Sequence, residues 1–175
     1  MPATDLPSTD SQVSARAFKD LFRHHPAGVG IVTLADENGS PIGFTATSVI
    51  SVSADPGILA FSITGTSSSW PALAAARSAV IGFLAQDQAE LSTRFATPGI
   101  DRFADQDIDW LPTGEPRLAA VSDWVRVEIA ERMPAGSSFL ITAQVTELGH
   151  ETSDGDRLVY VDRTYHRTGG HSQVG

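Results

Sequence analysis

The sequence contains no cysteine, which excludes disulfides, thiolate metal sites and cysteine nucleophiles. Long hydrophobic runs are also missing, because the apolar stretch 79–85 is far too short to span a bilayer. Residues 1–12 lack the basic and apolar regions of a secretory signal. We therefore expect a soluble, cytoplasmic protein with no membrane partner.

Positive charge is scarce as well. Lysine and arginine together number 12 against 21 aspartates and glutamates, which gives a formal net charge of −9, and Lys19 is the one lysine. Such a surface repels a phosphate backbone, so no nucleic-acid partner is expected. An anionic ligand would have to be met by a few placed arginines.

The motifs of several enzyme classes are missing too. There is no Walker loop and no Gly-x-Ser-x-Gly elbow, and the five histidines lack metal-ligand spacing with nearby carboxylates. Asp105 and Asp107 lie in a polar segment and are interpreted as solvated. Gly28 and Gly30 superficially match a dinucleotide fingerprint, but a proline precedes them and a strand pattern follows. No metal site and no catalytic dyad is predicted.

What is present is a series of strand patterns with few helices. At 175 residues the chain fits one domain, expected at 14–167 between a disordered tail at 1–13 and a flexible tail at 168–175. Helices are predicted from Ser14 to before Pro26 and at 71–76 and 88–95, and strands at 29–34, 42–53, 58–63, 79–84, 124–133, 139–147 and 158–161. The stretch 97–122 is predicted to be a long covering loop with short helical turns. This pattern indicates a mostly β, antiparallel barrel or sandwich with attached helices.

The stretch 43–53 is the most informative part of the chain. Thr45, Thr47, Ser51 and Ser53 fall at strand spacing, so we expect one strand with small hydroxyls along its outer face. Small hydroxyls allow a flat polar ligand to approach the backbone. An exposed strand without any function has the same pattern, since Thr and Ser are acceptable in strands.

Two further features are ambiguous on local grounds. Arg94, at the end of a predicted helix, could bind a phosphate through both arms of its guanidinium, but a surface cation near a helix C-terminus is commoner. The serines at 67–69 precede a predicted helix, where they could bind an anion or simply cap the helix.

The order of these pieces is more specific than any one of them. The relevant segments are PAGV at 26–29, GFTATS at 43–48, SVSADP at 51–56, SSSWP at 67–71, LSTRFA at 91–96, DRF at 101–103 and YVDRTY at 160–165. Taken together over residues 14 to 167, they resemble the flavin reductase-like family of flavin-binding split barrels. The resemblance implies a split β-barrel, typically a homodimer with flavin near the dimer interface.

The resemblance also implies an activity. NADH or NADPH would reduce FMN or FAD, and the reduced flavin would pass to a separate monooxygenase. Hydride transfer between two stacked rings needs no acid or base, which agrees with the missing dyad.

Site residues follow from the resemblance, position by position. Gly43, Phe44, Thr45, Thr47 and Ser48 would line the flavin ring, Ser62, Ile63 and Thr64 would border the ring and ribityl chain, and Ser68, Ser69, Arg94 and Phe95 would take the phosphate end. On the nicotinamide side the expected residues are Ser138, Tyr160 and Arg163. Ser138 stands where the family commonly has a histidine, and a serine cannot carry that charge. Two alternatives therefore stay open: a flavin-binding protein without reductase activity, and a flavin-dependent enzyme acting on an organic substrate.

Overall fold

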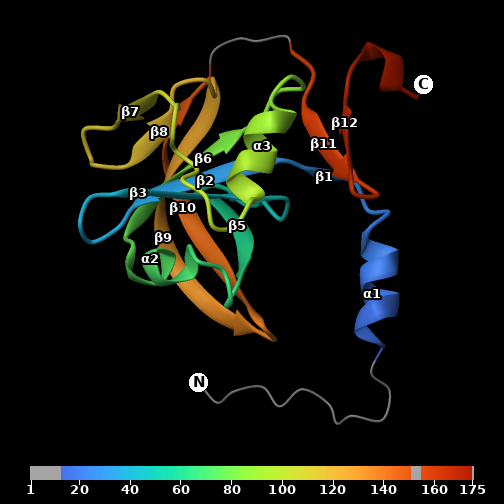
Figure 1. Cartoon of the computed structure of the whole chain (residues 1–175), viewed down its shortest axis with the longest axis horizontal. Helices are drawn as coiled ribbons and strands as arrows, with labels where there is room; N and C mark the ends of the chain where they lie inside the picture. Colours follow the sequence, from blue (N-terminus) through green and yellow to red (C-terminus); the bar gives the residue numbers. More distant parts are fainter. Residues whose placement is uncertain (1–12, 151–154, 175) are drawn as a thin grey trace.

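The computed structural model describes residues 13–150 and 155–174 (Figure 1). A seven-stranded antiparallel sheet forms its centre, in the order β3-β2-β6-β9-β10-β5-β4. The strands are β2 (Gly30–Ala35), β3 (Pro41–Ala46), β4 (Ile50–Ala54), β5 (Gly57–Thr64), β6 (Ser78–Phe83), β9 (Asp123–Ala135) and β10 (Ser138–Gly149). Residues 1–12 of the predicted N-terminal tail lie outside the described residues.

The sheet is curled into an open barrel. Its two edge strands, β3 and β4, follow each other in the chain and are joined by residues 47–49 alone, so the edges must approach each other. β3 also contacts β5, which is not its neighbour in the sheet. Register shifts along β9 and β10 increase the local bend. This mostly β architecture confirms the predicted split barrel.

The barrel interior holds the main core. Val32, Leu34, Phe61, Ile81 and Ile141 are fully buried there. Ile31, on the opposite face of β2, and Val29, directly before this strand, belong to a second, smaller cluster. Because both faces of β2 are covered by apolar side chains, the sequence of this strand is nearly all apolar.

Two predictions for the connections are wrong. The single strand expected at 43–53 is divided between β3 and β4, because the Ser48 hydroxyl accepts a hydrogen bond from the Ser62 N–H at 2.9 Å and the chain turns there. The stretch 97–122 contains a hairpin of β7 (Ile108–Trp110) and β8 (Pro116–Leu118) where helical turns were expected. Gly114, with φ of 97°, allows this tight turn.

Three α-helices of the described residues surround the barrel or flank it. α2 (Trp70–Ala75) and α3 (Ala89–Ala96) pack on the sheet, while α1 (Ala15–Phe22) has no buried residue and stands to one side (Figure 1). No helix in the described ranges is long and apolar enough to cross a membrane.

α1 leads into a small outlying sheet of β1 (Ala27–Gly28), β11 (Leu158–Val161) and β12 (Thr164–Arg167). Asp162 and Arg163, with φ of 50° and 62°, form the two-residue turn between β11 and β12. A short 3-10 helix, η1 (Gly170–Ser172), lies within the predicted C-terminal tail. We call α1 and this three-stranded sheet the outlying lobe.

Candidate functional site

A cavity of about 620 Å³, the first cavity, opens where the barrel meets the outlying lobe. The barrel contributes Thr47 and Ser48, which lie between β3 and β4, and the lobe contributes Tyr160 and Arg163. These two pairs are more than a hundred residues apart in the sequence. The structure therefore brings two predicted flavin-ring residues and two predicted nicotinamide-side residues to one cavity.

Local contacts fix the lobe side of this cavity. Tyr160 pairs with Ala27 across β11 and β1. The Asp162 N–H donates a hydrogen bond to the Arg23 carbonyl at 2.6 Å, and the Asp162 carboxylate lies 3.0 Å from the Arg23 Nε. The turn that carries Arg163 is thus tied to the segment that follows α1.

The barrel side carries a row of small hydroxyls. Ser48 bonds to both the N–H and the carbonyl of Ser62, at 2.9 and 3.3 Å. Along β5, Ser62 and Thr64 alternate with buried Ile63, and Thr64 lies opposite Ser138 of β10. Ser138, predicted for the nicotinamide side, therefore adjoins the hydroxyl row, whereas Tyr160 and Arg163 line the first cavity.

The first cavity is also rich in basic side chains for so acidic a chain. The cations Arg23 and Arg163 line it, and so does His25. Sequence reasoning missed Arg23 and His25, because nothing in the local pattern connects the end of α1 with the turn after β3. Their position favours an anionic ligand.

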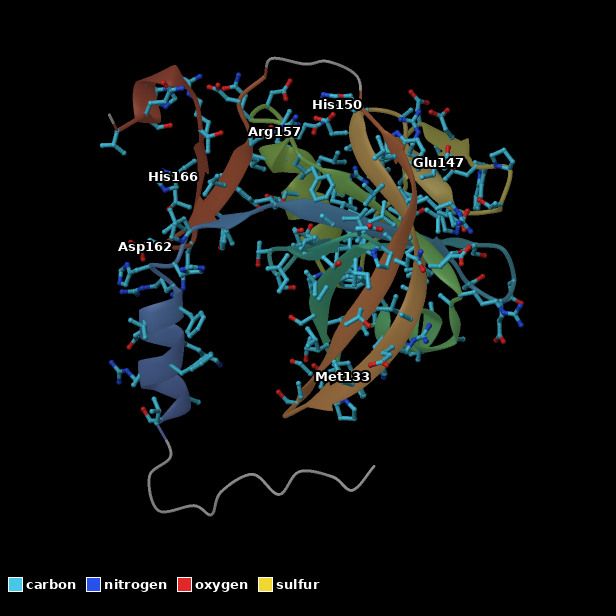
Figure 2. All side chains as sticks on the ribbon, turned by 180° about the vertical axis from the view of Figure 1, so that it is seen from behind. Met133, Glu147, His150, Arg157, Asp162 and His166 are labelled. Atoms are coloured by element: carbon cyan, nitrogen blue, oxygen red, sulfur yellow. The ribbon has the colours of Figure 1, made fainter. Side chains whose placement is uncertain are left out.

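A second cavity of about 490 Å³ shares Gly28 and Val49 with the first. Its walls are mainly apolar, and Asp123, His150 and Arg157 lie among its lining residues. Figure 2 shows His150 and Arg157 at the same end of the molecule, far from Met133 at the tip of the β9–β10 hairpin.

Asp123 is the buried member of that charged group. Its carboxylate lies 2.5 Å from the His150 Nδ1 and forms an ion pair with Arg157. Burial acts to raise the pKa of Asp123, but the interactions with His150 and Arg157 outweigh burial, so the pKa lies below its ordinary value. The carboxylate therefore stays ionised under the apolar wall.

Two other predicted ring residues, Gly43 and Thr45, lie in a crowded region between β3, α3 and residues 97–104, which we call the junction. The Thr45 hydroxyl donates to the Ser92 carbonyl at 2.6 Å. Phe95 is fully buried, with its ring centroid 5.0 Å from that of Phe103. A Cβ on Gly43 would lie 2.7 Å from the Phe95 Cε1, so only glycine fits there without movement.

The predicted phosphate residues also meet at the junction. Arg94 donates through Nη1 to the carbonyls of Asp101 and Ala104, at 3.2 and 3.0 Å. Ser69 is buried, whereas Ser68 is exposed. Arg102, which sequence reasoning gave no role, donates through Nη1 to the Gly43 carbonyl at 2.7 Å and to the Ser69 hydroxyl at 3.2 Å.

The structure thus sorts the predicted residues into three places. Thr47, Ser48, Ser62, Thr64, Ser138, Tyr160 and Arg163 lie at the first cavity or along the hydroxyl row, Gly43, Thr45, Ser68, Ser69, Arg94 and Phe95 lie at or beside the junction, and Phe44 and Ile63 lie in the barrel core. The contact of each with a flavin stays a prediction.

Comparison with known proteins places this geometry in a family. Residues 22–169 match the model of the flavin reductase like domain, which is most of the chain. The chain belongs to this family, as the ordered motifs of the sequence predict.

Individual relatives agree with that assignment. The chain is 40% identical over 166 residues to the NADH:FMN oxidoreductase of Rhodococcus qingshengii, covering 92% of this chain and 85% of that protein. It is 35% identical over 138 residues to the reductase component of the flavin-dependent trigonelline monooxygenase of Acinetobacter baylyi, covering 78% of this chain and 44% of that protein. A flavin reductase domain protein from Arthrobacter sp. FB24 superposes with a TM-score of 0.81 at 36% identity, covering 87% of this chain and 94% of that one.

Proposed function

We propose that this chain is an NADH-dependent FMN reductase that supplies reduced flavin to a separate monooxygenase. The observation that carries the proposal is the first cavity, which joins the hydroxyls of Thr47 and Ser48 to Tyr160 and Arg163. Relatives with the same domain are named as an NADH:FMN oxidoreductase and as the reductase component of a monooxygenase, which supports both the donor and the partner.

The residues present fit a flavin. A flat ring needs a surface without large side chains and with hydrogen-bonding groups along one edge, and the row Ser48, Ser62 and Thr64 offers both. Gly28, at the boundary of the two cavities, has no atom within 4 Å of where a Cβ would lie, so the space beside it is open. When bound, the flavin supplies a ring that accepts a hydride.

The protein contributes orientation to this chemistry. Because Ser48 is held at both polar groups of Ser62, it is fixed before any ligand binds, and a preorganised surface keeps two stacked rings in line. Ser138, beside Thr64, can donate or accept a hydrogen bond but carries no charge. We propose that Tyr160 and Arg163 meet the pyridine nucleotide, whose pyrophosphate pairs with the cations of the lobe.

The test is anaerobic oxidation of NADH and NADPH by the purified chain, with FMN or FAD added in turn. Rapid bleaching of excess flavin by NADH with FMN is the expected result. Flavin binding without bleaching by either nucleotide would overturn the reductase and favour a flavin carrier. A spectral change that needs an added organic substrate would favour a substrate-oxidising enzyme.

Matched variants separate the nucleotide side from general effects of charge. Asn accepts the positive φ of Arg163, so Arg163→Asn should raise KM for NADH by roughly tenfold and leave KM for FMN unchanged. Arg167→Asn is the control, since Arg167 is also an exposed arginine of this hairpin but lies outside the first cavity and bonds to Gln86. An equal rise in KM for NADH in both variants would mean that Arg163 does not bind the nucleotide.

We also propose that the chain works as a homodimer. On α1, Phe18, Leu21 and Phe22 are exposed, with the rings of Phe18 and Phe22 stacked at 4.4 Å. An eight-residue helix is marginal alone, so an apolar face of this kind requires a covering surface. A second copy supplies one, and Phe22 also lines the first cavity.

Light scattering after size-exclusion chromatography tests the homodimer. The wild type should have twice the mass of one chain, and a Phe18→Gln, Leu21→Gln double variant should shift toward the monomer. Lys19→Gln, on the polar side of the same helix, should stay dimeric. A monomeric wild type at micromolar concentration would refute the homodimer without affecting the reductase assay.

A further inference from the structure

Tyr165 of β12 bonds to a buried hydroxyl of α3. Its phenolic oxygen lies 2.8 Å from the Ser92 Oγ, and the Thr93 hydroxyl lies 3.5 Å from the same oxygen. Ser92 is fully buried, and Tyr165 is the one hydrogen-bond partner of its side chain in the described ranges. A buried hydroxyl is costly to leave unpaired, so this bond holds the Tyr165 side chain against α3.

The Tyr165 ring also contacts the Tyr160 ring. The two residues lie directly opposite each other on β12 and β11, which places their side chains on the same face of the outlying sheet. Their ring centroids are 5.1 Å apart, with 56° between the ring planes. Of these two tyrosines, it is Tyr160 that lines the first cavity. Tyr165 therefore connects α3 to a residue of the cavity wall.

Packing alone does not fix the Tyr165 ring. A further cavity of about 410 Å³ lies beside it, lined also by Leu158, His166 and His171. Tyr165 is only half-buried, so its ring has room to turn away from Tyr160. A tyrosine ring in such a place is oriented by the partner of its hydroxyl. The hydrogen bond to Ser92 is therefore the contact that selects the orientation of the ring.

We propose that Tyr165 is a positioning residue for the pyridine nucleotide. Its bond to Ser92 holds its ring behind Tyr160, and Tyr160 is thereby kept in the orientation that meets NADH. The proposal rests on the proposed function, because it takes Tyr160 to bind the nucleotide. It deepens that function by making nucleotide affinity depend on a contact between β12 and α3, behind the cavity wall.

Titration calorimetry and steady-state kinetics test this role. NAD⁺ cannot reduce a flavin, so its dissociation constant can be measured on the FMN-saturated chain, and kinetics give the KM values for NADH and FMN. Tyr165→Phe should weaken NAD⁺ binding and raise KM for NADH by roughly threefold to tenfold, as expected for one lost hydrogen bond. The KM for FMN should change by less than about twofold.

Ser92→Ala removes the same hydrogen bond from the side of α3. Alanine suits a helix, and the half-buried Tyr165 hydroxyl can turn to water. Ser92→Ala should therefore lose less stability than Tyr165→Phe, which leaves the Ser92 hydroxyl buried and unpaired. NAD⁺ binding should weaken by a similar factor in both variants. If Tyr165→Phe does not fold, Ser92→Ala decides, and an NAD⁺ affinity within about twofold of the wild type refutes the proposal.

A double variant tests whether Tyr165 acts through Tyr160. Tyr160→Leu removes the ring from the cavity wall and should itself weaken NAD⁺ binding. Adding Tyr165→Phe should then weaken it by less than about twofold more, because the two losses share one cause. Thr33→Val is the matched control, since it removes another buried hydroxyl bond, the one to the Pro116 carbonyl at 2.5 Å. This control should lower the melting temperature and leave both KM values unchanged.

The outcomes separate this proposal from the reductase function. Unchanged NAD⁺ affinity and KM in Tyr165→Phe, with an active wild type, would overturn the positioning role alone. Additive losses in the double variant would show that Tyr165 does not act through Tyr160. A parallel rise in KM for NADH and for FMN would make Tyr165 merely structural. A wild type whose NAD⁺ affinity depends on Tyr165 but which oxidises no NADH would overturn the reductase alone.

Discussion

The junction and the first cavity differ in whether their side chains are already packed and hydrogen-bonded within the protein. At the junction, Phe95 is fully buried and the Thr45 hydroxyl is bound to a backbone carbonyl. At the first cavity, Thr47 is exposed. It shares the walls of this cavity, whose volume is about 620 Å³, with residues of the lobe. Both regions carry predicted ligand residues, and at the second of them a cavity offers room for a ring.

This difference shows that neighbouring residues of one motif can have different roles. GFTATS at 43–48 runs from the junction into the cavity, so its first residues meet α3 and its last residues meet open space. We infer that the cavity binds the flavin ring and that the junction holds the cavity wall in place. Point substitutions in matched pairs can break or sharpen this distinction.

The largest effect is expected from alanine at two glycines. Gly43→Ala places a Cβ 2.7 Å from the Phe95 Cε1 and should lower the free energy of unfolding by roughly 3 kcal/mol. Gly28→Ala meets no atom within 4 Å and should change it by less than about 0.5 kcal/mol. Urea unfolding measures both, and equal losses would mean that the cavity side is as tightly packed as the junction.

A buried charge beside the second cavity should give the next largest effect. Asp123→Asn should lower the free energy of unfolding by about 2 kcal/mol at pH 7, because it leaves Arg157 and His150 without their anion. Since the folded pKa of Asp123 lies below its ordinary value, its contribution is present above that value and is lost as the pH falls through it toward the folded pKa.

The gap between wild type and Asp123→Asn should therefore narrow below about pH 4, near the ordinary pKa of an aspartate. Urea unfolding at pH 7, 5 and 3.5 measures the gap. A gap that stays constant over this range would mean that the carboxylate charge does not stabilise the fold, and that the wall of the second cavity depends on packing alone.

Valine substitutions at two threonines of one motif compare the junction with the first cavity most directly. Thr45→Val removes the hydrogen bond to Ser92 and should lower the free energy of unfolding by about 1 kcal/mol, with FMN affinity unchanged. Thr47→Val should leave the melting temperature unchanged and weaken FMN binding by roughly threefold to tenfold, because Thr47 lines the first cavity and Val removes its hydroxyl. The opposite pattern would place the ring at Thr45, as the resemblance implies.

Much of the fold could be predicted because it depends on local patterns. The period-two and apolar runs of β5, β6 and β10 lie in the sequence itself, and the predicted ranges match the observed strands within a few residues. The break between β3 and β4 could not be predicted, because it depends on a hydrogen bond that the Ser62 N–H donates to the Ser48 hydroxyl. Strands as short as β1 have too few residues for any pattern, and form because Ala27 pairs with the distant Tyr160.

The candidate site divides in the same way. Residue types and motif order pointed to Thr47, Ser48, Tyr160 and Arg163, which the fold brings to one cavity. Arg102 could not be distinguished from any other arginine in a polar loop, because its partners, Gly43 and Ser69, lie far from it in the sequence.

The smallest effect is expected at the exposed ion pair that ties the lobe together. The Asp162 carboxylate is 57% exposed and the Arg23 side chain 36% exposed, so their 3.0 Å contact should contribute no more than about 0.5 kcal/mol. Asn accepts the φ of 50° at this position, so Asp162→Asn removes the charge without straining the turn.

The loss in Asp162→Asn should disappear at about 1 M salt, where the screening length is only about 3 Å. Urea unfolding at low and high salt measures it, with Arg16→Gln as a control that breaks the exposed Arg16–Asp20 pair within α1. A larger loss that persists at high salt would show that the turn depends on more than this charge. The lobe wall of the first cavity would then be held by stabilising contacts like those of the junction. The two regions would differ only in the open volume beside their side chains.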